Sequence, residues 1–244
     1  MTLKIFWRFG FIFYLALISF IITFVGTLLG LITYTETIMV IITVSIFLVV
    51  GRIAGLFVEY IDEKLVEGKY RKALEYYSNE IESNPYFASA YNDRGNVRYI
   101  LDDYIGAKSD YNKAIELDPN FTQAYNNLGI VKMYIDGLST AEPYYNKSIE
   151  LDSSYTNAYF NRGLMHYCRS EFGKSIKDFE KCTQLNPKDA QAFYYCGLSR
   201  IGNGDENLGK HDIKNAKILG ITVKEELYIK ETVRELKLLE KNKK

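Results

Sequence analysis

The chain has few of the residues that build chemical sites. It contains two histidines, His166 and His211, and three cysteines, Cys168, Cys182 and Cys196, among 244 residues. No two cysteines have the spacing of a zinc site, and neither histidine lies in a motif that activates a nucleophile. Glycine-rich phosphate-binding loops are absent as well. We therefore expect no bound metal, no cofactor and no enzymatic activity.

An excess of charge of either sign is also missing. Lys and Arg together number 30, as do Asp and Glu, so the formal net charge at pH 7 is zero. Proteins that bind nucleic acids usually concentrate basic residues on one surface, and a balanced chain provides no such field. We predict that no nucleic acid is a partner.

Charge is almost absent from the beginning of the chain. Between residues 9 and 58 the only charged side chains are those of Glu36 and Arg52. Because about 20 apolar residues span a bilayer, this length predicts two transmembrane helices, near 9–31 and 38–57, with the turn at Glu36. A signal peptide is the alternative, but no small-x-small cleavage site follows the apolar core, and a second apolar segment comes next.

Basic residues flank this predicted hairpin on its open side and are missing from its turn. Lys4 and Arg8 precede the hairpin, and Lys69 and Arg71 follow it. Both termini are therefore expected on the cytoplasmic side. Residues 1–58 form the predicted anchor of an integral membrane protein. The richness of the chain in Lys, Asn, Ile and Tyr is typical of an AT-rich bacterial genome, which places this protein in a bacterial inner membrane.

Two pairs of glycines within the anchor have the small-xxx-small spacing that lets membrane helices approach closely. They are Gly26 with Gly30, and Gly51 with Gly55. This pattern predicts a homo-oligomer or contact with another membrane protein. Packing inside the hairpin, or chance, is the alternative.

The rest of the chain repeats itself with a period of 34 residues, in frames that start at residues 54, 88, 122, 156 and 190. Position 8 is glycine in the last four frames, and position 24 is large and apolar in all five: Gly95, Gly129, Gly163 and Gly197, then Tyr77, Tyr111, Tyr145, Phe179 and Ile213. The apolar spacing predicts two helices per frame, separated by a short polar turn. Pro85, Pro119 and Pro187 at position 32 form the corner into the next frame.

This pattern resembles the tetratricopeptide repeat, over roughly residues 54–220. The resemblance implies an all-α, right-handed superhelix of about five repeats, a solenoid preceded by the transmembrane helical hairpin. The first frame departs from the pattern with Ile61 at position 8, and the third has Ser153 in place of proline. Residues 221–244 are predicted to form a capping helix over the last repeat, or alternatively a coiled-coil helix.

The first helix of each tetratricopeptide repeat lines a concave groove, and positions 2, 5, 6 and 9 face into it. The resemblance therefore implies a partner-binding groove at Asn92, Asn96, Gln123, Asn126, Asn127, Asn157, Phe160, Asn161, Gln191, Tyr194 and Tyr195. Amides can donate to and accept from a peptide backbone, and aromatic rings supply contact area, so an extended neutral peptide suits this groove. The three cations with which chaperone-binding relatives hold a carboxylate are missing here.

Charged residues follow the repeat in two further ways. Positions 7 and 23 agree in being charged or uncharged in four of five frames, as in Arg94 with Asp110 and Arg162 with Asp178, which predicts contact across the hairpin. Coincidence is the alternative. Position 11 carries a basic ladder of Lys64, Arg98, Lys132, His166 and Arg200. The ladder either meets acidic segments of a partner or is paired locally.

Together these patterns predict a membrane-anchored adaptor whose groove binds a partner polypeptide at the cytoplasmic face. The alternative is a structural subunit of a membrane complex, in which the anchor oligomerises and the repeats bridge subunits.

Overall fold

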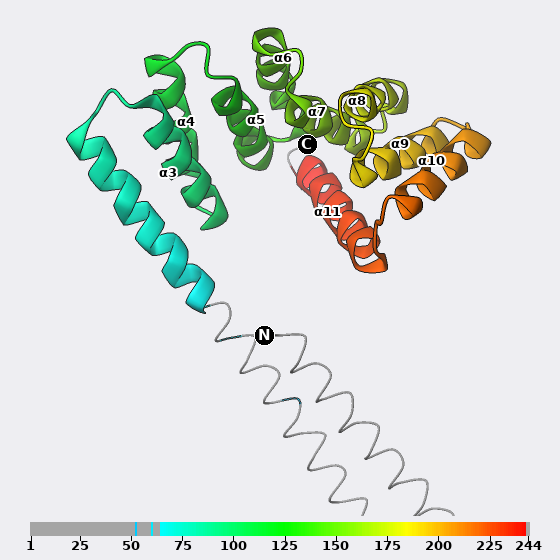
Figure 1. Ribbon diagram of the computed structural model, residues 1–244, viewed down its shortest axis with the longest axis horizontal. Coiled ribbons are helices and arrows are strands. Elements are labelled where there is room, and N and C mark those ends of the chain that lie inside the picture. Colours follow the sequence, from blue (N-terminus) through cyan, green and yellow to red (C-terminus); the bar gives the residue numbers. More distant parts are fainter. Residues whose placement is uncertain (1–51, 53–59, 61–63, 243–244) are drawn as a thin grey trace, which may run out of the picture. The chain divides into compact units, whose positions relative to one another are not determined.

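The structure is a computed structural model that describes Arg52, Tyr60 and residues 64–242 (Figure 1). The chain divides into two compact units, Met1–Lys69 and Tyr70–Lys244. All complete repeats belong to the second unit, so the description below concerns that unit unless stated otherwise.

The predicted membrane anchor falls almost entirely outside the described residues. Of the spans at 9–31 and 38–57, only Arg52 is described, and Gly26, Gly30, Gly51 and Gly55 are not. Among the helices that the structure does describe, none is both long and apolar enough to cross a bilayer.

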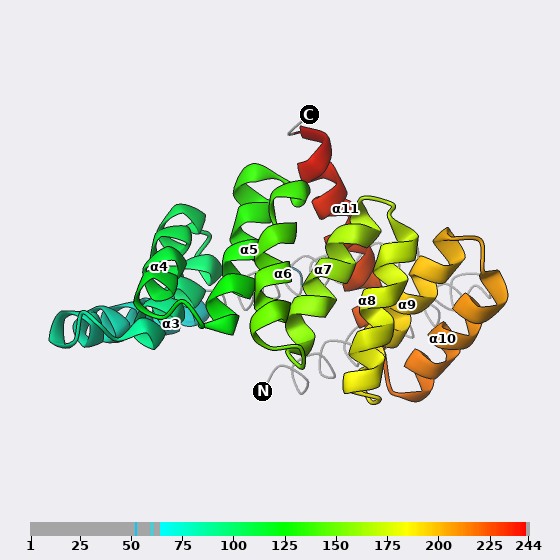
Figure 2. The same cartoon turned by 90° about the horizontal axis from the view of Figure 1, so that it is seen from above.

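The four frames that start at residues 88, 122, 156 and 190 each form a helical hairpin. The hairpins are α3 (Ala88–Ile100) with α4 (Tyr104–Leu117), α5 (Thr122–Asp136) with α6 (Glu142–Leu151), α7 (Thr156–Cys168) with α8 (Phe172–Leu185), and α9 (Ala190–Gly202) with α10 (Glu206–Ile218). They lie side by side in chain order, as Figures 1 and 2 show. The unit is thus an all-α solenoid.

The turn inside a hairpin depends on two consecutive residues. Position 15 has a positive φ in Asp102 (60°) and Ser170 (62°), which ends the first helix. Position 16 is acidic in the same hairpins, and Asp103 caps the second helix by accepting a hydrogen bond from Gly106 N at 2.9 Å. The third frame instead turns at Gly137 and a 3-10 helix, η1 (Leu138–Thr140).

The first frame does not make this turn, contrary to the sequence prediction of two helices in every frame. Every residue from 64 to 83 is helical, including residues 67–69, where the turn was expected. Position 16 of this frame is Lys69, which cannot cap a helix N-terminus and bears the charge that the helix dipole disfavours there. Ile81 is the one buried side chain among residues 64–83.

The corner between hairpins depends on a side chain that the sequence pattern left unnoticed, the Asp or Asn at position 31. Asp118 Oδ1 accepts a hydrogen bond from Asn120 N at 2.9 Å, and Asp152 Oδ1 accepts one from Ser154 N at 2.8 Å. This Asx turn closes the corner whether position 32 is proline or Ser153. The departure of Ser153 from the repeat pattern therefore leaves the corner intact.

The two helices of a hairpin cross at the glycine of position 8. A Cβ atom placed on Gly95 would lie 2.7 Å from Cε1 of Tyr111, and one on Gly129 would lie 2.7 Å from Cε1 of Tyr145. In the last hairpin the neighbour is backbone, since a Cβ on Gly197 would lie 2.7 Å from the carbonyl oxygen of Gly209. At Gly95, Gly129 and Gly197 even a methyl group would therefore require the neighbouring ring or backbone to move.

Buried side chains form two separate clusters. The smaller cluster joins the hairpins α3–α4 and α5–α6 and contains Ala107, Tyr111, Leu128 and Val131. The larger cluster runs from Met133 in α5 through the later hairpins to Leu236. Most of the buried apolar residues therefore belong to the C-terminal half of the array.

The last helix, α11 (Val223–Asn242), begins with a capping box formed by Thr222 and Glu225. Glu225 N donates to Thr222 Oγ1 at 3.2 Å, and Thr222 N donates to Glu225 Oε2 at 2.7 Å. The helix then lies against α7 and η1, which belong to earlier repeats (Figures 1 and 2). A helix that only covers the last repeat, as the sequence suggests, would not reach them.

Replacing Gly129 with alanine should lower the free energy of unfolding by about 1–3 kcal/mol, because the new methyl group would overlap the ring of the buried Tyr145. Gly173→Ala is the matched control, since this helical glycine is exposed and its Cβ would meet nothing within 4 Å. That control should unfold at the same denaturant concentration or a slightly higher one. Urea denaturation of the full-length chain, followed by circular dichroism, measures both, and equal stability of the two variants would contradict the crossing geometry.

Candidate functional site

Side-chain amides on the inner helices α3, α5 and α7 form a hydrogen-bonded row, the amide row, of Asn92, Asn96, Asn126, Asn127 and Asn161. Asn161 Nδ2 donates to Asn126 Oδ1 at 2.8 Å, and Asn126 Nδ2 donates to Asn127 Oδ1 at 3.1 Å. Asn127 Nδ2 in turn donates to Asn92 Oδ1 at 3.0 Å and to Asn96 Oδ1 at 2.9 Å. Residues expected to bind a partner thus also bind one another, from repeat to repeat.

The solvent exposure of the predicted groove amides depends on their position in the repeat. Asn92 and Asn126, at position 5, are only 6% and 3% exposed. Asn127 and Asn161, at position 6, are half-buried. The exposed amides are those of position 2, which are Gln123, Asn157 and Gln191. A partner on this face would therefore meet the position 2 amides first and the half-buried ones beneath them.

The aromatic end of the predicted groove is packed into the core. Tyr194 and Tyr195 are each only 3% exposed. The ring of Tyr195 stacks on Phe179 with centroids 5.3 Å apart, and Phe160 meets both rings edge-on at 5.4 and 5.5 Å. Residues of α11 belong to the same core cluster, so these two tyrosines are covered in this structure, and their contact with a partner stays a prediction.

The predicted contact between positions 7 and 23 is confirmed in two hairpins as a bidentate ion pair. Arg94 donates from Nε and Nη2 to the two carboxylate oxygens of Asp110 at 2.9 and 2.7 Å. Arg162 does the same with Asp178 at 3.0 and 2.7 Å. Both aspartates are buried, so the paired arginine is what makes their charge tolerable.

The basic ladder at position 11 is paired locally, which is the second of the two alternatives left by the sequence. Each of its members has an acidic neighbour within its own repeat frame: Lys64 with Glu67, Arg98 with Asp110, Lys132 with Asp136, His166 with Glu171, and Arg200 with Asp212. Arg98 and Arg200 each contact the aspartate at position 23 of their own hairpin. This is the position that the sequence predicts to contact position 7. Arg98 and Arg200 thus join the two helices of their hairpins, whereas Lys64 and Lys132 pair within one helix.

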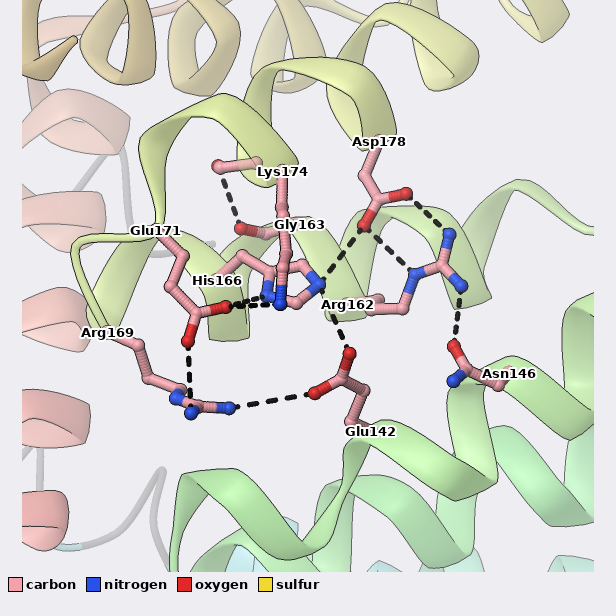
Figure 3. Close-up of polar contacts among 10 residues, drawn as sticks. Glu142, Asn146, Arg162, Gly163, His166, Arg169, Glu171, Lys174 and Asp178 are labelled. Carbon is pink, nitrogen blue, oxygen red and sulfur yellow. Dashed lines mark hydrogen bonds and ion pairs between the residues drawn. The ribbon is translucent and has the colours of Figure 1, made fainter.

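His166 is the centre of the densest of these networks (Figure 3). Its ring is 2% exposed, with Nδ1 2.8 Å from Glu171 Oε2. Nε2 lies 3.9 Å from both Glu142 Oε1 and Asp178 Oδ2. The histidine thus connects carboxylates from α6, from α8 and from the turn between α7 and α8.

Cations balance the carboxylates around His166. Glu171 pairs with Arg169 Nη2 at 3.0 Å and with Lys174 Nζ at 3.1 Å. Burial alone would raise the pKa of Glu171, but hydrogen bonds from Lys174 and His166 outweigh it and lower that pKa. Over residues 64–242 no group of His, Cys, Asp and Glu side chains has a geometry that could hold a metal ion. The arrangement is that of an internal ion-pair network.

A shallow pocket of about 400 Å³ lies away from the inner face, at the C-terminal end of the helix over 64–83. Its lining is Tyr76, Asn79, Glu80, Ser83, Asn84 and Phe87. Tyr76 and Phe87 are 58% and 44% exposed. None of these residues belongs to the predicted groove.

Two of the hairpins match models of a known protein family. Models described as "Tetratricopeptide repeat" match residues 88–121 and residues 156–189, which are the frames of α3–α4 and α7–α8. The chain contains tetratricopeptide repeats. A comparison with curated protein sequences gives no significant match.

Several solved structures share the fold. A crystal structure of MamA is 24% identical, with a TM-score of 0.56, and the alignment covers 65% of this chain and 92% of that one. A MamA structure from Desulfovibrio magneticus RS-1 is 20% identical, with a TM-score of 0.56 and coverage of 68% and 94%. YrrB, described as "a TPR protein with an unusual peptide-binding site", is 23% identical, with a TM-score of 0.54 and coverage of 67% and 84%. At these identities the likeness concerns the fold alone.

Two tyrosines at the same place in successive tetratricopeptide repeats have different surroundings. Tyr111 Oη donates to Asn96 Oδ1, at position 9 of its repeat, at 2.8 Å. Tyr145 Oη is buried without a hydrogen-bond partner among the described residues. Position 9 of its repeat is Ile130, which offers no acceptor. The fourth repeat has Phe179 at the same place, with no hydroxyl to satisfy.

Removing the two hydroxyls should therefore change stability in opposite directions. Tyr145→Phe should raise the free energy of unfolding by about 1 kcal/mol, because it removes an unsatisfied buried group. Tyr111→Phe should lower it by about 0.5–1.5 kcal/mol through the lost bond to Asn96. Paired urea titrations test the difference, and a shift of the same sign in both variants would refute this account.

Proposed function

We propose that this chain is an interaction adaptor, in which the inner face of the tetratricopeptide repeats binds a segment of a partner polypeptide. The observation that carries the proposal is the amide row with the exposed amides of Gln123, Asn157 and Gln191 beside it. The bonds between repeats hold the amide row in one arrangement before any partner arrives, which lowers the entropic cost of binding. The description of YrrB, which has a similar fold, includes a peptide-binding site.

The partner segment should be extended and largely neutral. The exposed amides occur once per repeat in the three successive frames that start at residues 122, 156 and 190, so a chain that runs along their inner helices meets one amide in each of these three repeats. Amides donate to and accept from main-chain groups without selecting a charge. The position 11 cations that could attract an acidic segment already have carboxylate neighbours.

The second part of the proposal places this face at the cytoplasmic side of a membrane. Its support is the sequence alone: the nearly uncharged run over residues 9–58 and the basic residues on either side of it. In the alternative, a structural subunit, Gly26 and Gly30 would hold an oligomer together. Replacing both with leucine would then dissociate the oligomer in detergent, whereas an adaptor tolerates the change.

Partner binding is tested with a triple variant, Gln123→Ala, Asn157→Ala and Gln191→Ala, in the full-length chain. Proximity labelling in cells should recover the partner at least about tenfold less well, because three hydrogen bonds of about 0.5–1.5 kcal/mol each are lost. Asn120→Ala, Gln184→Ala and Asn207→Ala together are the matched control, since these exposed amides lie off the inner helices. Equal recovery with both variants would remove the inner face from the proposal.

Membrane orientation needs a separate measurement. A protease added to spheroplasts, whose inner membrane is intact, should leave residues 64–242 undigested. The same protease should digest these residues in inverted inner-membrane vesicles. Digestion from the outside would reverse the proposed orientation and leave the peptide-binding test unaffected.

A further inference from the structure

The helix α11 covers the aromatic end of the inner face with a single apolar stripe. Ile229, Val233 and Leu236 are 3%, 9% and 2% exposed, and their spacing of i, i+4 and i+7 places them on one side of the helix. The same core cluster contains Tyr194 and Tyr195. These tyrosines were expected to face a partner, so the chain's own C-terminal helix covers part of the predicted partner site.

Polar contacts at the two ends of this stripe fix the direction of α11. Near its beginning, Glu226 pairs with Lys217 Nζ at 3.5 Å. Near its end, Lys237 Nζ lies 5.2 Å from the centroid of the Tyr167 ring, within the range of a cation–π contact. The covered surface thus recognises a helix with an acidic residue before the apolar stripe and a basic one after it.

Other features indicate that α11 can leave without unfolding the repeats. Much of the helix faces solvent, including Leu227, Tyr228 and Leu238, which are 56%, 66% and 48% exposed. Its capping box uses only Thr222 and Glu225, so the N-terminal cap goes with the helix when it detaches. The chain enters α11 through Gly220, which has a φ of 101° and no atom within 4 Å of a would-be Cβ.

We propose that α11 is a displaceable occupant of a helix-binding site, and that an amphipathic helix of the partner takes its place. The partner helix has apolar residues at i, i+4 and i+7, an acidic residue before them and a basic residue after them. This inference rests on the proposed function and extends it. The amide row takes an extended segment, and the aromatic end of the same face takes a helix once α11 has moved.

Cys168 is a native reporter of this movement. It is 7% exposed at the end of α7, the helix that α11 contacts. Burial raises the pKa of its thiol to about 12, against the opposing charge of Lys237 on α11. Cys182 and Cys196 are 0% and 2% exposed, and Cys182 Sγ lies 3.6 Å from Thr156 O within its own hairpin. Release of α11 should expose Cys168 and leave the other two thiols protected.

The test uses the full-length chain in detergent with two double variants of equal charge. Val233→Glu with Leu236→Glu places carboxylates in the buried stripe and should release α11. Leu227→Glu with Leu238→Glu places them on the exposed side and is the matched control. Thiol labelling mapped by mass spectrometry should be about tenfold faster or more at Cys168 in the release variant alone, given the burial energy that is lost.

A labelled synthetic peptide of residues 221–244 then acts as the probe for the vacated site. It should bind the release variant saturably with one peptide per chain, and it should not bind the control, whose own α11 is present at a high effective concentration. Failure of the peptide to bind a release variant whose Cys182 and Cys196 remain protected would overturn the proposal. So would equal labelling of all three thiols, which would make α11 an inseparable part of the core.

A third outcome concerns the occupant. If the wild-type chain is a dimer that exchanges α11 between copies, seen as mixed cross-links between differently labelled chains, the site belongs to a second copy and the partner helix is wrong. No step in this test uses the partner that the amide row is proposed to bind. A negative result here therefore does not affect the partner-recovery experiment with the Gln123, Asn157 and Gln191 variant.

Discussion

The contact between the glycine at position 8 on one helix and the residue at position 24 on the next sets how closely the two helices of a hairpin approach. The other contacts between these two helices depend on that distance. Because Gly95 and Gly129 have no side chain, the rings of Tyr111 and Tyr145 lie directly on the helix backbone. Positions 7 and 23, one residue before each member of the contact, are thereby brought face to face. Arg94 and Asp110 occupy them in the second repeat, and their bidentate pair follows from the crossing.

The same geometry explains the position 11 cations. Position 11 lies one helical turn beyond position 7, on the same face of the first helix. Arg98 therefore reaches Asp110 from one side while Arg94 reaches it from the other. The last repeat has Cys196 at position 7, and there Arg200 forms an ion pair with Asp212 in place of a position 7 arginine. In the second and last repeats the position 11 arginine therefore bridges the two helices of its hairpin, whereas Lys64 and Lys132 pair with a carboxylate on their own helix.

The structural features that recur in each 34-residue frame could be predicted from the sequence. Helix number, the crossing glycine and the pair at positions 7 and 23 all recur, and four of the five frames have the expected hairpin. The first frame differs because Lys69 stands at position 16, which is acidic in three of the other frames and glycine in the third frame. The residues of the amide row were predicted to face the groove, but the hydrogen bonds between them were not. These bonds depend on the distance between neighbouring repeats, which cannot be obtained from residue spacing within one frame. The capping helix was predicted over the last repeat, and its contacts with α7 and η1 were missed for the same reason, because they join segments from different frames.

The two core clusters give the array an uneven resistance to force. In stacked repeats each unit is stabilised by its own packing and by its neighbours, so a break propagates from the weakest interface. Tension applied through the N-terminal segment arrives first at the small cluster of Ala107, Tyr111, Leu128 and Val131. The hairpins from α7 onward share the larger cluster with α11 and would remain folded as the second repeat peels away. Pulling on such a chain would lengthen it in steps from one end.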